Sequence, residues 1–134
     1  MEQLASLATR KKSATTRLTK SSKIIKTIIA AIQEKKGQHI VSLDLRKINE
    51  AVADFFIVCE AGSQPQVRAV AENIDTRVRE ICGEAPYHQE GQQASQWILI
   101  DYVNVVVHVM HPETRTFYKL EEMWSDAVSQ AHED

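Results

Sequence analysis

Apolar residues recur along the first part of this chain at spacings typical of a helix followed by a strand. We expect the helix to begin after Ser22 and to end near Gly37, because its isoleucines share one face: Ile24, Ile25, Ile28, Ile29 and Ile32. Between His39 and Leu45, apolar and polar positions then alternate, which predicts a strand. The chain therefore opens, after its first 22 residues, with a helix and a strand.

A buried strand and a long helix are predicted next. From Asp54 the run DFFIVCEA is apolar on both faces, which is typical of an interior strand in a sheet covered by helices. Ser63 and Gln66 have the spacing of a capping box, so a helix should begin there. Its apolar positions recur every three or four residues until Gly83, a residue suited to ending a helix.

The last third of the chain predicts a hairpin and a terminal helix. Residues 96–102 and 104–111 are apolar segments close enough in sequence to pair as antiparallel strands. Val103 in the turn is β-branched and resists the positive φ that tight hairpin turns need, whereas Asn104 tolerates it better. A terminal helix is predicted from apolar residues spaced three and four apart: Phe117, Leu120, Trp124 and Val128.

These elements predict an α/β fold in the order α-β-β-α-β-β-α, with a mixed sheet of about four strands and helices packed against it. Residues 84–91 are expected to form a loop. We expect residues 23–134 to form a single domain, since 134 residues suffice for only one ordinary core. Residues 1–22 are expected to be a basic, disordered leader.

Charge is distributed unevenly between these two parts. Residues 1–26 carry a net charge of +6 and the remaining residues carry −8. The leader is rich in Arg, Lys, Ser and Thr, a composition shared by disordered bacterial extensions and organellar transit peptides, so cytoplasmic location in a bacterium and organellar import both stay open. A basic arm could also contact RNA through phosphates, whereas the acidic body favours a basic partner.

Other composition features exclude membrane and secreted classes. The longest apolar runs have five residues, Ile28 to Ile32 and Phe55 to Cys59, far below the ~18 needed to cross a bilayer. No secretory signal precedes them. Cys59 and Cys82 lack a metal-binding or redox spacing, which favours two buried thiols in a reducing compartment.

The search for catalytic chemistry ends without an enzyme. Gly62 and Ser63, at a strand-to-helix junction, are typical of nucleotidyltransferases, but these enzymes need two carboxylates on a neighbouring strand to hold two metal ions. The corresponding strand offers Asp101 alone. His108 and His111 should point to opposite faces of a strand, and Cys59 in an apolar strand should stay protonated. We therefore predict no metal ion and no other cofactor.

Two long stretches resemble the ribosomal silencing factor family, also called Iojap-related proteins. They are DFFIVCEAGSQPQVRAVAENI and EGQQASQWILIDYVNVVVHVMHPETRTFYKLEEMWSDA, and the similarity runs from about residue 24 to residue 127. The resemblance implies a nucleotidyltransferase-like α/β fold that has lost its catalytic carboxylates. It also implies a protein, often a homodimer when free, that binds the large ribosomal subunit through its fourteenth protein and blocks joining of the small subunit.

Carried onto this sequence, the resemblance suggests partner-binding residues among aromatic, acidic and basic side chains near the chain's end: Trp97, Asp101, Tyr102, His108, Arg115, Tyr118, Glu121 and Trp124. The chain departs from the family at Val103 and Asn104, where relatives usually have Gly-Asp. Two alternative functions stay open at this point. One is a large-subunit assembly factor, and the other is a residual nucleotide-binding protein that uses Gly62 and Ser63.

Overall fold

The structure, a computed structural model, describes residues 22–48, 51–123 and 127–132. The basic leader predicted for residues 1–22 therefore lies, apart from Ser22, outside the described residues. The helices and strands follow one another as α2 (Lys23–Glu34), β1 (Gln38–Asp44), β2 (Phe55–Glu60), α3 (Gln64–Cys82), β3 (His88–Glu90), β4 (Trp97–Asp101), β5 (Val105–Met110), α4 (Pro112–Tyr118), α5 (Leu120–Met123) and β6 (Val128–His132).

One mixed sheet organises these elements, in the spatial order β3-β4-β5-β2-β1-β6. β2 and β5 pair in parallel, with Phe55 opposite Val105, and the other neighbouring strands pair antiparallel. Every residue of β5 is buried, which agrees with its place inside the sheet. The predicted α/β class with a mixed sheet and flanking helices is confirmed.

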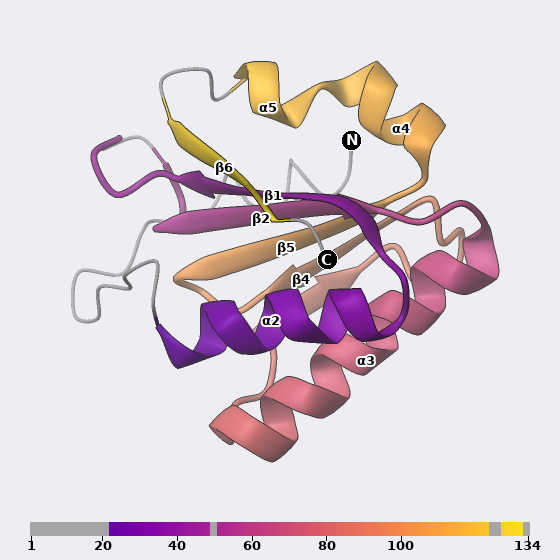
Figure 1. Cartoon of the computed structure of the whole chain (residues 1–134), viewed down its shortest axis with the longest axis horizontal. Helices are drawn as coiled ribbons and strands as arrows, with labels where there is room; N and C mark the ends of the chain where they lie inside the picture. Colours follow the sequence, from indigo (N-terminus) through magenta and orange to yellow (C-terminus); the bar gives the residue numbers. More distant parts are fainter. Residues whose placement is uncertain (1–21, 49–50, 124–126, 133–134) are drawn as a thin grey trace.

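Helices cover both faces of the sheet. α2 and α3 lie side by side across one face, and α4 and α5 lie across the other (Figure 1). The larger core lies under α2 and α3, where Ile28 and Ile74 pack with Ile57 and Val107 of the central strands. A smaller cluster under α4 and α5 joins Val58, Trp97, Met110 and Leu120. No helix in the described ranges is both long and apolar enough to cross a membrane.

The boundaries of α2 and α3 follow from local chemistry that the sequence reveals. Gly37 follows α2 at a position where an added Cβ would collide with Cγ2 of Ile32, so only glycine fits there. Oγ of Ser63 accepts the backbone N–H of Gln66 (3.2 Å), as a capping box requires, while Oε1 of Gln66 accepts the N–H of Gly62 (3.2 Å). α3 ends at Gly83, whose φ of 67° is in the left-handed region.

The prediction for the end of the chain is wrong in two respects. Instead of one terminal helix, α4 ends at Tyr118 because Lys119 adopts a φ of 49°, and α5 is only a short second helix. Val128, expected on the helix stripe, lies in β6 and pairs opposite Asp44 of β1. The sheet also has six strands rather than about four, since β6 and the short β3 within the expected loop both join it.

The hairpin turn between β4 and β5 places strain on the residue least suited to it. Val103 has a φ of 75°, whereas Asn104, which tolerates a positive φ better, does not adopt one. The Asn104 N–H donates to the Tyr102 carbonyl (3.0 Å), which closes a γ-turn around Val103 in its rare, strained form. The Val103 N–H donates to Oδ1 of Asp101 (2.7 Å), which helps to hold this conformation.

Replacing Val103 by glycine should therefore stabilise the protein. Strain of about 1–3 kcal/mol at a positive-φ, β-branched residue would be relieved, against about 0.5–1 kcal/mol of added backbone entropy in the unfolded chain. We expect the free energy of unfolding to rise by about 1 kcal/mol, measured by urea denaturation. Val103→Ala is the matched control, because it shortens the same side chain but leaves an L-residue at positive φ. An equal effect of both substitutions would contradict the role of strain.

Candidate partner-binding surface

Three of the predicted binding residues meet in an aromatic cluster between the sheet and α4. Trp97 of β4 and His108 of β5 lie on neighbouring strands, and Nε1–H of Trp97 donates to Nδ1 of His108 (3.0 Å). Tyr118, at the end of α4, packs on Trp97 with ring centroids 4.9 Å apart. Phe56 of β2 contacts His108 edge-on at 4.7 Å. The strands thus hold a stack of rings beneath α4.

His108 is the polar centre of this cluster and is fully buried. Because Nδ1 accepts the Trp97 proton, the neutral ring carries its own proton on Nε2. Within the part of the chain that the structure describes, Nε2 has no hydrogen-bond partner. Burial lowers the pKa of His108 to about 3, since an apolar surrounding disfavours the charged ring. His108 is thus a neutral packing residue at ordinary pH.

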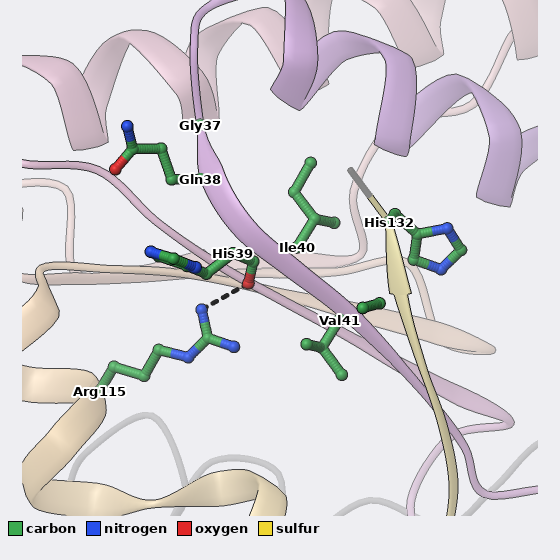
Figure 2. A pocket seen from close by; sticks show the side chains of 8 residues that line it. Gly37, Gln38, His39, Ile40, Val41, Arg115 and His132 are labelled. Atoms are coloured by element: carbon green, nitrogen blue, oxygen red, sulfur yellow. Dashed lines mark hydrogen bonds between the residues drawn. The ribbon is translucent and has the colours of Figure 1, made fainter. Parts of the chain in front are cut away.

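Arg115 fastens α4 to the sheet. One guanidinium nitrogen donates to the backbone carbonyl of His39 (2.6 Å) in β1 and to Oε1 of Glu60 (3.2 Å) in β2. Figure 2 shows the first of these bonds, with the Arg115 side chain reaching from α4 to the bulged start of β1. His39 itself is exposed and has a φ of 50°. The arginine therefore sets the position of α4 over the sheet.

α4 also begins with local capping chemistry. The backbone N–H of Glu113 donates to Nδ1 of His111 (3.4 Å), and Pro112 occupies the first turn, where a missing N–H costs nothing. Together with Arg115, this cap orients a seven-residue helix that has no buried side chain of its own. α4 is thus held by its start, its arginine and Tyr118 just at its end.

Two further predicted residues lie in the hairpin rather than on the surface. Asp101 is 3% exposed and Tyr102 is 6% exposed. The Asp101 carboxylate accepts the Val103 N–H in the turn. The Tyr102 hydroxyl is buried, and burial raises its pKa. In the isolated chain Asp101 thus stabilises the turn, and Tyr102 packs in the larger core.

The last two predicted residues are Glu121 and Trp124. Trp124 lies outside the described residues. Glu121 belongs to α5, but its side chain is likewise outside what the structure describes. The predicted partner contacts of the whole set stay predictions. What the structure adds is that Trp97, Asp101, Tyr102 and His108 are buried in the free chain.

The exposed part of this region is a surface that we call the α4 surface. It comprises two neighbouring hollows that share Thr116: one of about 400 Å³, lined by Pro112, Glu113, Thr116 and Phe117, and one of about 530 Å³, lined by His39, Glu60, Arg115, Thr116, Lys119 and Glu122. Sequence reasoning missed Phe117 as a surface residue, because its spacing from Leu120 placed it on the apolar stripe of a helix.

A third hollow continues from the α4 surface around the edge of the sheet. It measures about 500 Å³ and is lined by Gly37, Gln38, His39, Ile40, Val41, Arg115, Ala131 and His132 (Figure 2). His132 of β6 is fixed there by a hydrogen bond of 2.8 Å with Oγ of Ser42. Burial lowers the pKa of His132 as well. Three neighbouring hollows therefore lie around α4 and the start of β1.

The nucleotide-binding alternative gains no support from the start of α3. Its anion-binding potential depends on free backbone N–H groups. Those of Gly62 and Gln66 are already taken by the side chains of Gln66 and Ser63. Asp101, the one candidate metal ligand, is buried in the hairpin. Burial also raises the pKa of the Cys59 thiol to about 12, which suppresses it as a nucleophile.

Comparison with known proteins gives a consistent result. The family described as "Ribosomal silencing factor during starvation" matches residues 18–134. The chain is 38% identical over 104 residues to ribosomal silencing factor RsfS of Bacillus subtilis, covering 78% of this chain and 86% of that protein. It is 36% identical over 104 residues to the protein of the same name from Halalkalibacterium halodurans, covering 78% and 87%.

A crystal structure and an organellar protein extend the comparison. The structure of a Chromobacterium violaceum protein matches with a TM-score of 0.72 and 34% identity, over 76% of this chain and 83% of that one. The mouse protein named "Mitochondrial assembly of ribosomal large subunit protein 1" is 31% identical over 74 residues, 54% of this chain and 32% of the mouse protein. The family match spans nearly the whole chain, and so this chain belongs to the ribosomal silencing factor family.

Proposed function

We propose that this chain binds the large ribosomal subunit through its fourteenth protein and blocks joining of the small subunit, without catalysing a reaction. The observation that carries the proposal is the family match over residues 18–134, together with relatives named ribosomal silencing factor. Residues 27–134 carry a net charge of −8, which suits binding to a basic ribosomal protein. The protein would act in the cytoplasm, where bacterial subunits join.

Such a mechanism requires only occupancy of a surface. A bound obstacle must leave before the small subunit joins, so its own binding free energy opposes subunit association. Catalytic groups are unnecessary, and the groups most suited to catalysis in the sequence, Cys59 and His108, are fully buried. The inhibition should therefore rise with protein concentration and saturate at one protein per large subunit.

Sedimentation with purified ribosomal subunits tests this proposal. We expect the protein to migrate with large subunits at moderate salt, not with small subunits, and to reduce the peak of joined ribosomes when added before mixing. Subtracting the fourteenth protein from reconstituted large subunits should abolish the interaction. Joined ribosomes forming undiminished beside saturating protein would overturn the blocking mechanism.

The second candidate function is assembly of the large subunit. The observation that favours it is the similarity to the mouse protein whose name states that role. Both functions use a surface of the same subunit, so binding alone does not separate them. Depletion of this protein separates them, because an assembly factor leaves immature large subunits behind, whereas a silencing factor leaves mature subunits that join too readily.

Two partner proposals accompany the main one. We propose that residues 1–26, at +6, contact ribosomal RNA phosphates, although residues 1–21 lie outside the described residues. Removing residues 1–21 should then make subunit binding less dependent on salt. We also propose a homodimer for the free protein, which analytical ultracentrifugation would detect as twice the mass of 15.2 kDa. A monomer at tens of micromolar concentration would overturn the second of these.

A further inference from the structure

One large aromatic side chain on the α4 surface is left facing solvent. Phe117 is 77% exposed, more than the other exposed large apolar residues in the described part of the chain: Ile81, Tyr87 and Val128. Water contact with so much apolar surface is unfavourable in the free protein, and covering it on binding would recover that free energy. Exposed aromatics of this kind recur at the centres of protein interfaces.

The Phe117 ring lies against an aromatic neighbour that is itself packed on the sheet. Phe117 packs edge-on against Tyr118, with ring centroids 4.9 Å apart and planes at 74°. Tyr118 in turn packs on Trp97, which is hydrogen-bonded to the buried His108. Arg115 fastens the same helix to β1. The helix that carries Phe117 and the tyrosine beside it are therefore fixed before binding, which lowers the conformational entropy that the anchor loses when it binds.

The surroundings of Phe117 suit insertion between the side chains of a partner. Phe117 lines the hollow of about 400 Å³ with Pro112, Glu113 and Thr116, and the hollow of about 530 Å³ begins at Thr116. A raised ring beside two depressions can enter an apolar socket while the partner's own side chains fill the depressions. The shape therefore offers an anchor together with a rim.

Charge indicates what surrounds the partner's socket. Glu113 and Glu122 are exposed, one in each hollow, while Glu60 is neutralised by Arg115 at 3.2 Å. Lys119 is an exposed positive charge of this surface, and the body beyond residue 26 carries −8. A basic protein surface with lysines or arginines around an apolar socket is the complementary partner.

We infer that Phe117 is the central anchor through which this chain grips a basic protein surface of the large ribosomal subunit, with Glu113 and Glu122 at its rim. This inference rests on the proposed function and adds the place and chemistry of the contact. The deeper aromatic residues Trp97, His108 and Tyr118 act through Phe117 as positioning residues. The occupant of the surface is the ribosomal protein rather than a second copy of this chain.

The test compares the Phe117→Ala variant with the unaltered protein, both full-length, in titrations against purified large subunits. We expect binding to weaken by about 30-fold or more, the effect of losing an interface anchor, while the melting temperature stays unchanged because the ring is exposed. The matched control is Tyr87→Ala, which removes an aromatic ring that is 71% exposed and lies just before β3, at the opposite edge of the sheet from β6. It should leave affinity unchanged. Glu113→Lys should also weaken binding to large subunits, and the loss should be larger at low salt than at high salt.

The possible results separate this inference from the proposed function. If the unaltered protein does not bind large subunits, the proposed function fails before the variants are compared. If it binds and Phe117→Ala binds equally well, only the anchor is overturned. If Phe117→Ala instead shifts the free protein from dimer to monomer and keeps its affinity for subunits, the surface joins two copies of this chain and the inference is overturned.

Discussion

Replacing Trp97 by alanine is expected to lower the free energy of unfolding by about 3–5 kcal/mol, the cost of removing a large aromatic side chain from a core. Trp97 is 4% exposed and packs with Val58, Met110 and Leu120 on the face of the sheet that α4 covers. Its indole N–H satisfies Nδ1 of His108. Guanidinium chloride denaturation of the two proteins measures the difference directly.

Trp97→Phe separates packing from hydrogen bonding at the same position. A phenyl ring keeps most of the apolar contact but leaves Nδ1 of His108 buried without its donor, which should cost about 1–3 kcal/mol. Ribosome binding by this variant should be close to normal if Trp97 acts only as a support for α4. A folded, fully stable Trp97→Ala protein that has lost ribosome binding would contradict the supporting role and restore Trp97 as a direct contact.

Elements whose boundaries depend on neighbouring residues could be predicted from the sequence. The capping box at Ser63 and Gln66 and the glycine at residue 83 bound α3 by contacts within a few residues. β2 could be predicted as an interior strand because its apolar character on both faces reflects burial on both faces. These elements could be predicted because the residues that determine them lie within the element or within a few residues of it.

The end of the chain could not be predicted in the same way. α4 stops where Lys119 adopts a positive φ, and a lysine carries no sign of that conformation. β6 is an exposed edge strand without apolar alternation, and it exists because Ile40–Asp44 of β1 lie beside it. Its pairing joins segments more than 80 residues apart. Tertiary contacts of this kind override the helical spacing on which the prediction relied.

The candidate site could likewise be predicted from the sequence only in part. Three of the residues that the resemblance suggests, Trp97, His108 and Tyr118, lie in contact with one another, while their role in partner binding stays a prediction. Which ring would be buried and which exposed depends on how α4 is placed, and that placement depends on a bond from Arg115 to the carbonyl of His39, 76 residues away. A periodic pattern carries no information on such a bond, so Phe117 was predicted to lie inside.

Acidification is expected to destabilise the protein through His108. Its pKa is about 3 in the folded protein against 6.5 for an ordinary histidine, so the unfolded chain takes up a proton first as the pH falls. The stability present above about pH 6.5 is therefore lost progressively between pH 6.5 and pH 3, at about 1.4 kcal/mol per pH unit. Between pH 7 and pH 5 the expected loss is about 2 kcal/mol, measured by urea denaturation across that range.

The contribution of His108 can be isolated from that of the carboxylates, which also titrate in acid, by comparing the unaltered protein with His108→Gln. Glutamine keeps an oxygen that can accept the Trp97 N–H but has no proton to gain, so the difference in unfolding free energy between the two proteins should shrink as the pH falls from 7 to 5. His39→Asn is the matched control, because it removes an exposed imidazole with a residue that tolerates positive φ. Parallel pH profiles for the unaltered protein and His108→Gln would mean that the ring reaches solvent in the folded state, and the aromatic cluster beneath α4 would then be far looser than its hydrogen bond and ring contacts imply.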